Sequence, residues 1–336
     1  MTNIGIVGVG AYLPERVLTN AEIEEFSDYD RSARRGRALH EWATRIHGGV
    51  ERRRAAPDEA TSDLCTKAAQ VALKDAGYDA GDVDLLVLAT LSNDHRLPPA
   101  SAKVQHNLGF EGKFIQLDSA CTGFLDAVLV GKALLETGMY ARALVVCGDV
   151  TGPWLDPRDW LTQSVFGDGA GAAVLEPVAD GYGLTHMVSG SDGHLGDYIT
   201  IHDRGSRPES DPFLRIDFGK VHTWGIGRMA EAGRQVLKRA ELEPADLDLV
   251  VPHQASARMV RETAEYLGVS MDKVVLTYPY VGNTVGSSVG VALHEHHSRT
   301  PIQDGDHVLL ISVGAGMAWC AGLLRWGGRR SAELSG

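Results

Sequence analysis

Cys121 is the residue whose surroundings best suit covalent chemistry. It follows the apolar run 114–117 and a turn of small residues, and an amphipathic helix is predicted to begin at about Thr122. The sulfur would then lie at a helix N-terminus, where free backbone N–H groups and the helix dipole favour the thiolate. A small buried hydrophobic side chain is the commoner fate of a cysteine. The turn alone therefore leaves both interpretations open.

His253 and Asn283 are candidates to act together with this thiol. His253 follows the buried run 247–251, and open α/β sheets place their active sites at the carboxyl ends of strands. Asn283 lies in a glycine-flanked turn before another predicted helix. An asparagine in such a turn can be only a turn former or a helix cap. A site that His253 and Asn283 share with Cys121 is a better explanation than a purely structural role.

The loop 312–319 follows the apolar run 307–311 and supplies candidate backbone donors. Gly314 and Gly316 permit backbone conformations that expose N–H groups to a ligand. Such groups suit an oxyanion hole, in which the loss of one donor typically costs about 3–4 kcal/mol of transition-state stabilisation. We therefore expect this loop to face the reacting centre.

Three closely spaced histidines, His294, His296 and His297, do not predict a metal site. They lie on a predicted helix without a carboxylate at the HExxH spacing. We expect a solvated helix end here and no metal ion.

An internal repeat predicts how the candidate residues come together. The helix–turn–strand plan of 68–90 recurs in 233–254, and the strand 143–150 recurs in 307–314. Aligning Asp84 with Asp248 gives the same spacing as aligning Val145 with Leu309. Short β-branched runs that alternate with helices predict parallel βαβ units that are buried on both sides.

The fold class predicted from this repeat is α/β, with two pseudo-symmetric halves in one layered α/β/α/β/α body. The first half, 1–175, carries Cys121, and the second, 176–336, carries the histidine and the asparagine. The repeat places the turn of Asn283 where the first half has the turn of Cys121. The segment 180–220 departs from the repeat and is predicted to be an insertion that lines the site.

Composition narrows the functional classes. The 336 residues are 44% hydrophobic and 23% charged, which is typical of one large globular domain or two closely packed ones. A net charge of −12 argues against a nucleic-acid partner. No apolar run is long enough to cross a membrane, no secretion signal is recognisable, and the four separated cysteines form no disulfide framework. We expect a cytoplasmic protein.

Eight arginines between Arg31 and Arg54 stand out against this acidic background. A solvated helix face is the simpler interpretation. The alternative is a landing site for an anionic partner, such as a phosphate-bearing cofactor or an acidic carrier protein.

Several motifs together resemble β-ketoacyl-acyl-carrier-protein synthase III and its relatives. They follow that family's order over nearly the whole chain, and as a set they are specific: DSACTGF at 118–124, FGDGAGA at 166–172, HQAS at 253–256, GNT at 282–284 and VGAGMAW at 313–319. The opening GVGAYLPERVLTNAEIE and the segment EWATRIHGGVERR are also similar. The resemblance implies a thiolase fold.

The resemblance further implies a catalytic triad of Cys121, His253 and Asn283. Cys121 would accept an acyl group from a coenzyme A or carrier thioester. His253 and Asn283 would hydrogen-bond the thioester carbonyl of a malonyl unit and stabilise the enolate formed as carbon dioxide leaves. The backbone N–H groups of Cys121 and Gly316 would form the oxyanion hole. No permanently bound cofactor is implied, because coenzyme A or phosphopantetheine arrives as part of the substrate.

The resemblance also assigns residues around the site. Trp42, Arg45, Ser256 and Arg258 match positions that contact the coenzyme or its pantetheine arm. Leu97 matches a position that projects into the acyl pocket of a partner subunit, which implies a homodimer.

Departures from the family pattern favour a specialised relative that serves a natural-product pathway such as polyketide synthesis. Ser256 replaces the usual asparagine, Pro153 stands where housekeeping members carry an arginine, and the segment 29–40 lengthens the chain. Decarboxylative condensation is the leading expectation, and acyl transfer to an oxygen or nitrogen of a small acceptor is the alternative. A thiolase would need a second cysteine near Ser312, and a non-catalytic scaffold would have little use for the triad.

Overall fold

The computed structural model describes residues 2–201 and 211–329. Its first half is built on a five-stranded sheet whose order is β1-β7-β6-β4-β5. β4 runs parallel to β5 and β6, whereas β7 is antiparallel to β6 and to β1. The bounds are β1 Ile4–Tyr12, β4 Leu85–Ala89, β5 Lys113–Leu117, β6 Ala143–Asp149 and β7 Gly169–Pro177.

The second half repeats this plan in a four-stranded sheet whose order is β11-β12-β13-β8. The backbone of Val274, bridged to Val250, occupies the place that β5 has in the first sheet. Val87 pairs with Val145 and Val251 with Leu310, so the repeat holds to within one residue. The bounds are β8 Gly183–Ser191, β11 Leu249–Pro252, β12 His307–Gly314 and β13 Ala318–Arg325.

Two expectations about the strands need correction. The sheets are mixed rather than parallel, because β7 and β13 follow β6 and β12 through connections that lack the long helix needed to return a strand in parallel. β8 belongs to the repeat as the counterpart of β1, so the insertion predicted at 180–220 begins only after Ser191. The division of the chain at 175 and 176 stays a prediction.

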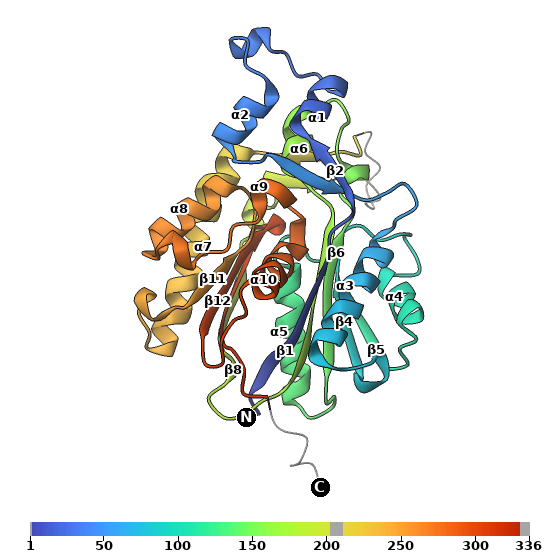
Figure 1. The fold of residues 1–336 in the computed structure, drawn as a ribbon, viewed down its shortest axis with the longest axis vertical. Helices are drawn as coiled ribbons and strands as arrows, with labels where there is room; N and C mark the ends of the chain where they lie inside the picture. The colour runs from blue at the N-terminus through green and yellow to red at the C-terminus, as the bar shows by residue number, and fades with distance from the viewer. Residues whose placement is uncertain (1, 202–210, 330–336) are drawn as a thin grey trace.

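Five layers follow from where the apolar faces are buried. Two helices, α5 Gly123–Glu136 and α10 Ser288–Arg299, lie between the sheets and share one core with strands of both (Figure 1). α3 Thr61–Ala76 and α4 Ala100–Leu108 cover the outer face of the first sheet. α7 Phe218–Ala240 and α8 Ala257–Leu267 cover the second. The predicted α/β/α/β/α layering is therefore confirmed.

Shorter elements gather at one end of the layers, at the top of Figure 1. They include a two-stranded sheet and small helices: β2 Arg16–Thr19, β3 Glu51–Arg54, α1 Asn20–Phe26, α2 Leu39–Ile46, α6 Trp160–Val165 and α9 Tyr278–Val281. A hairpin of β9 Ile199–Ile201 and β10 Leu214–Ile216 follows β8. Within the described ranges, no helix is both long and apolar enough to cross a membrane.

Candidate active site

The turns that precede the two central helices touch each other. A Cβ atom on Gly286 would lie 3.4 Å from the Cα of Gly123 and 2.6 Å from the carbonyl oxygen of Ala120. Only a residue without a side chain leaves room for this approach. The duplication thus brings the turn of Cys121 and the turn of Asn283 to one centre.

Cys121, His253 and Asn283 line one cavity of about 1010 Å³. Cys121 directly precedes α5, whose N-cap is Thr122, and His253 directly follows β11, as the sequence predicted. Asn283 lies between α9 and α10. The structure brings the three predicted residues together, whereas their catalytic roles stay predictions.

The last glycine loop holds the backbone of Cys121 from the other side. Ser312 donates its hydroxyl hydrogen to the carbonyl oxygen of Cys121 at 2.6 Å. A Cβ on Gly314 would lie 2.8 Å from the backbone nitrogen of Cys121 and 3.1 Å from that of Thr122. The position of the nucleophile therefore depends on a side chain being absent at residue 314.

Replacing Gly314 with alanine should displace the turn of Cys121 and slow acyl loading by roughly 10- to 100-fold, the usual effect of misplacing a reacting group. The rate of adduct formation with an acyl thioester, followed by intact-protein mass spectrometry, measures this. Gly227→Ala is the matched control, because a Cβ at Gly227 in α7 would meet nothing within 4 Å. Equal loading rates in the two variants would contradict the expected role of Gly314.

Burial dominates the electrostatics of the thiol. It raises the pKa of Cys121 to about 12, and the charge of Asp149 adds to the rise. The backbone N–H groups of Ala315 and of Cys121 itself act in the opposite direction and lower this pKa. The predicted stabilisation of the thiolate by N–H groups is thus present, but burial of the sulfur has the larger effect on its pKa. The Cys121 thiol is therefore protonated at neutral pH.

Asp149 is the buried carboxyl group behind this effect. Its Oδ1 accepts hydrogen bonds from the hydroxyl of Thr90 at 3.0 Å and from the backbone N–H groups of Leu91 at 2.9 Å and Ser92 at 3.2 Å. Burial raises the pKa of Asp149 to about 7. The carboxyl group therefore anchors a loop that lines the cavity, and it carries less negative charge below neutral pH.

His253 enters the cavity as a neutral imidazole. Its backbone N–H donates to the carbonyl of Ile311 at 2.8 Å, and its Nδ1 lies 2.6 Å from the hydroxyl of Ser288. Burial lowers the pKa of His253 to about 3. A neutral ring can donate a hydrogen bond without adding charge to the site.

Asn283 lines the cavity, and its side-chain oxygen is held by a backbone hydrogen bond. Its Oδ1 accepts a hydrogen bond from the backbone N–H of Val285 at 2.9 Å, and its own N–H donates to the carbonyl of Val165. Val285 has a φ of +54°, which is strained for a β-branched residue. The strained turn fixes the amide orientation, since it places the N–H of Val285 on Oδ1.

Gly316 has a φ of +74° and lies between Ala315 and Met317, which both line the cavity. Gly316 is not among the described residues that line it. The backbone donors that act on the sulfur are the N–H groups of Ala315 and of Cys121 itself. The oxyanion hole of Cys121 and Gly316 stays a prediction, with Ala315 as a neighbouring donor that the sequence did not single out.

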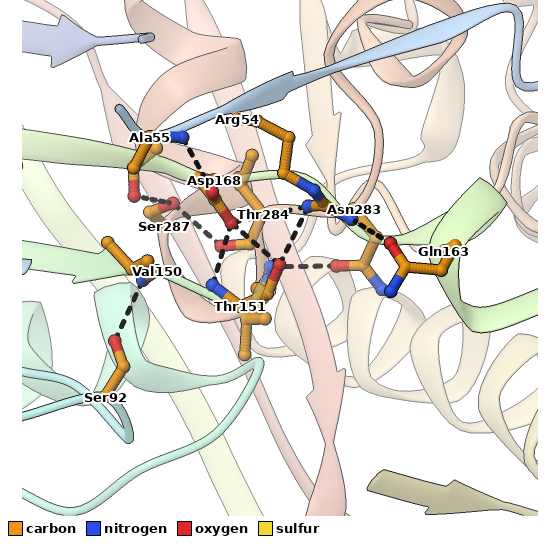
Figure 2. A network of polar contacts seen from close by, with 12 residues as sticks. Arg54, Ala55, Ser92, Val150, Thr151, Gln163, Asp168, Asn283, Thr284 and Ser287 are labelled. Atoms are coloured by element: carbon orange, nitrogen blue, oxygen red, sulfur yellow. Dashed lines mark hydrogen bonds and ion pairs between the residues drawn. The ribbon is translucent and has the colours of Figure 1, made fainter. Parts of the chain in front are cut away.

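A buried ion pair lies beside the asparagine turn. Arg54 approaches the carboxylate of Asp168 at 3.4 Å, and that carboxylate also accepts hydrogen bonds from the N–H groups of Thr151 at 2.7 Å and Ala55 at 2.8 Å. Figure 2 shows this network beside Asn283. The FGDGAGA motif therefore contains a structural carboxylate, which the sequence interpretation quoted only as a motif.

The residues assigned to the coenzyme are distributed unevenly. Trp42 and Arg258 line the cavity. The ring of Trp42 packs edge-on against Trp160 with centroids 4.7 Å apart, and Arg258 donates to the carboxylate of Glu262 at 2.7 Å. The sequence did not predict the contact of Trp42 with Trp160.

Ser256 and Arg45 have different surroundings. Ser256 lines the cavity, and its hydroxyl accepts the N–H of Met259 at 3.0 Å as the N-cap of α8. Arg45 is exposed on α2 and is not among the described residues that line the cavity. Contacts of all four residues with a coenzyme remain predictions.

His47 is a buried residue of the cavity wall that the sequence did not single out. Its Nδ1 accepts hydrogen bonds from the hydroxyl of Tyr278 at 2.8 Å and from the N–H of Gly49 at 3.2 Å, and its Nε2 lies 3.3 Å from the hydroxyl of Ser164. Burial lowers the pKa of His47 to about 4. Its contacts join α2, α6 and α9, so the role of His47 is structural.

Apolar side chains form the remaining wall near the thiol. The hairpin of β9 and β10 pairs Ile201 with Leu214 and Ile199 with Ile216, and all four line the cavity. This agrees with the expectation that an insertion lines the site, although 202–210 lies outside the described residues. Further apolar residues of this wall are Trp154, Leu161 and Phe218.

Leu97 lies on the loop between β4 and α4, where 82% of its surface is exposed. It does not contact the cavity of its own chain, whereas Arg96 beside it does. This exposure is compatible with the expected insertion into a partner subunit.

The histidine cluster lies at the end of α10, where a helix was predicted. It is half-buried rather than solvated, because the His297 ring packs against Trp326 with centroids 4.8 Å apart and His294 Nδ1 lies 3.2 Å from the carbonyl of Val9. In the part of the chain that the structure describes, no group of three or more ligating side chains could hold a metal ion.

Comparisons with known proteins agree with this fold. The family model described as 3-oxoacyl-[acyl-carrier-protein (ACP)] synthase III matches residues 115–193, and its C-terminal counterpart matches 237–326. A β-ketoacyl-[acyl-carrier-protein] synthase III of Caldanaerobacter subterraneus is 35% identical over 331 residues, covering 96% of this chain and 97% of the relative. One from Listeria monocytogenes is 36% identical over 326 residues, covering 97% and 99%.

Solved structures give the same result. The β-ketoacyl-[acyl carrier protein] synthase III of Thermus thermophilus superposes with a TM-score of 0.89 at 35% identity, covering 96% of this chain and 99% of that one. The priming β-ketosynthase of the R1128 polyketide pathway gives a TM-score of 0.89 at 30% identity, covering 98% of each chain. These matches confirm the thiolase fold and identify a condensing enzyme. The chain belongs to the 3-oxoacyl-[acyl-carrier-protein] synthase III family.

Proposed function

We propose that this protein loads an acyl group from a thioester onto Cys121 and condenses it with a malonyl thioester. The observation that carries the proposal is the convergence of a thiol, a neutral imidazole and an oriented amide on one cavity. A nucleophile that forms a covalent intermediate divides a difficult transfer into two easier steps. Neutral donors suit the oxygen of an enolate.

The first step transfers the acyl group. The sulfur of Cys121 attacks the thioester carbonyl carbon, and the tetrahedral oxygen is stabilised by backbone N–H groups of the Cys121 turn and the 314–317 loop. The carbon–sulfur bond to the donor then breaks. The donor thiol leaves with the proton of Cys121, and the acyl-enzyme remains. The apolar wall formed by the β9–β10 hairpin excludes water that would hydrolyse this intermediate.

The second step forms the carbon–carbon bond. His253 Nε2–H and the Asn283 amide donate to the carbonyl oxygen of the malonyl thioester. The carbon–carbon bond to the carboxylate breaks and carbon dioxide leaves. The electron pair of that bond stays on the remaining fragment and forms an enolate. The enolate carbon attacks the acyl carbonyl, and the Cys121 sulfur leaves as a thiolate that takes a proton from solvent. Coenzyme A or phosphopantetheine takes part only as the carrier of a substrate.

A natural-product pathway is the setting that we propose for this reaction. The likeness to a polyketide priming ketosynthase supports it. Pro153, which stands where housekeeping members of the family are expected to carry an arginine, lies in the cavity wall. An acyl carrier protein and acyl coenzyme A are the proposed partners, since the relatives are named for the carrier protein.

The test supplies labelled acyl coenzyme A, followed in separate reactions by malonyl coenzyme A, a malonyl carrier protein, or small alcohols and amines. A labelled β-ketoacyl thioester is the expected product. A labelled ester or amide without carbon–carbon product would instead establish acyl transfer to oxygen or nitrogen. Protein lacking the thiol, Cys121→Ala, is the control for uncatalysed transfer.

A homodimer completes the proposal, with Leu97 inserted into the partner's acyl pocket. Replacing Leu97 with aspartate should weaken dimerisation by at least about tenfold, because burying a leucine side chain contributes about 1.5–3 kcal/mol. Light scattering of the purified protein over a concentration series measures the change. Met139→Asp is the matched control, since Met139 is 70% exposed on a different loop. Equal effects of the two substitutions would contradict the placement of Leu97.

A further inference from the structure

We propose that the hydroxyl of Ser288 fixes His253 in the tautomer that carries its proton on Nε2. His253 is then a hydrogen-bond donor in the cavity and not the base that removes the proton of Cys121. The inference rests on the proposed function for its consequence, but the tautomer itself can be observed without any activity. Ser288 is a positioning residue, since it acts through the imidazole.

The geometry around Ser288 is close and buried. Ser288 is the first residue of α10 and is 2% exposed. Its Oγ lies 2.6 Å from His253 Nδ1 and also accepts the backbone N–H of Gln254 at 3.3 Å. Among the described residues, this hydroxyl makes no other hydrogen bond. Its hydrogen is therefore directed to Nδ1.

Proton accounting then selects one tautomer. A neutral imidazole has one N–H and one acceptor nitrogen. If Nδ1 carried the proton, it would donate to Ser288, and the buried hydroxyl hydrogen would have no acceptor, which costs free energy. If Nε2 carries the proton, Ser288 donates to Nδ1 and accepts from the backbone N–H of Gln254, so the hydroxyl, Nδ1 and this N–H are all paired. The second arrangement fits all the contacts.

The neighbouring Ser287 shows that this contact is specific to one hydroxyl. Ser287 is equally buried, but its Oγ donates to the carbonyl oxygens of Thr284 at 2.8 Å and Gly169 at 3.1 Å. The two adjacent serines thus have different hydrogen-bond partners: Ser287 binds backbone carbonyls, and Ser288 binds the imidazole of His253. The pair supplies a matched control.

The backbone around His253 is held independently of Ser288. The side-chain amide of Gln254 donates to the carbonyls of Pro252 and Val275, and its Oε1 accepts the N–H groups of Thr277 and Tyr278. Loss of the Ser288 hydroxyl should therefore change the tautomer balance rather than the path of the chain.

The chemical consequence concerns both steps. With Nε2–H and the Asn283 amide both donating, the enolate oxygen receives two hydrogen bonds. The thiol proton of Cys121 cannot pass to Nε2, which has no free electron pair. It leaves with the donor thiol, so the acyl-transfer step balances without a basic histidine.

The test compares Ser288→Ala with Ser287→Ala, using protein with ¹⁵N-labelled histidine. Nitrogen chemical shifts distinguish the protonated from the unprotonated ring nitrogen, and His253→Gln identifies the His253 signals. We expect Nε2–H in the wild type and in Ser287→Ala, and a mixture of tautomers in Ser288→Ala. Ser288→Thr, which keeps the hydroxyl, should restore the wild-type spectrum and also serves if the alanine variant does not fold.

Kinetics supply the second readout. Ser288→Ala should slow decarboxylation of malonyl coenzyme A by roughly 10- to 100-fold, as loss of an orienting partner does elsewhere, while acyl loading of Cys121 stays close to wild type. An Nδ1–H signal in the wild type, or an unchanged spectrum in Ser288→Ala, would overturn the inference. A wild-type protein that shows Nε2–H but decarboxylates nothing would instead overturn the proposed function.

Discussion

Cys121→Ala is expected to abolish acyl-enzyme formation. The variant lacks the only thiol of the protein's described residues that lines the cavity. Loss of a nucleophile typically reduces turnover by about 10⁴-fold or more. Intact-protein mass spectrometry after incubation with acyl coenzyme A should show the acyl mass on the wild type and none on the variant. Product formation should fall with it.

Cys320→Ala is the control for this result. Cys320 is buried in β13, and burial raises the pKa of its thiol well above the usual range. Acyl loading should survive in this variant. An adduct on Cys121→Ala at the wild-type level would refute Cys121 as the nucleophile.

His253→Ala should separate the two chemical steps. Acyl loading of Cys121 should continue, because the thiol proton can leave with the donor. Decarboxylation of malonyl coenzyme A should fall by about 10²- to 10³-fold, the usual effect of removing a donor from a developing oxyanion. Release of labelled carbon dioxide measures the second step, and mass spectrometry measures the first.

The pH dependence gives an independent check on His253. Since the folded-state pKa of His253 is about 3, the ring is neutral above that value, and its donor form is fully present from pH 5 to 8. The rate of decarboxylation should therefore not fall near pH 6.5 because of His253. Any fall seen there should be the same in the wild type and in His253→Ala. His297→Ala, at the far end of α10, should decarboxylate normally. Normal carbon dioxide release by His253→Ala would remove His253 from this step.

Much of the fold was predictable because the chain repeats its own pattern. The runs 85–89 and 249–252 are apolar and follow helix and turn signals at the same spacing, so the layered plan could be predicted. The mixed strand directions could not be predicted in this way. A buried strand has the same apolar composition whether its neighbour is parallel or antiparallel. The place of β8 was missed because only three of its nine residues are buried, so it lacks the continuous apolar run of a central strand.

The candidate site was predictable to the level of residue types. A cysteine before a helix, a histidine after a strand and an asparagine in a glycine turn each have local signals, and the repeat and the family resemblance joined them. Contacts across the fold had no such signal. Ser288 lies next to another serine in the sequence, and only the packing of α10 against the end of β11 distinguishes their roles.

The sequence by itself determined the layered architecture, the family and the identity of three residues around one cavity. The tertiary structure decided their chemical state. Local sequence predicted a thiol favoured by helix N–H groups, but burial among apolar side chains and the nearby Asp149 raise the pKa of Cys121 to about 12. Solvation and charge depend on every segment that surrounds a group. For that reason the protonation of Cys121 and the orientations of His253 and Asn283 follow from the folded protein alone.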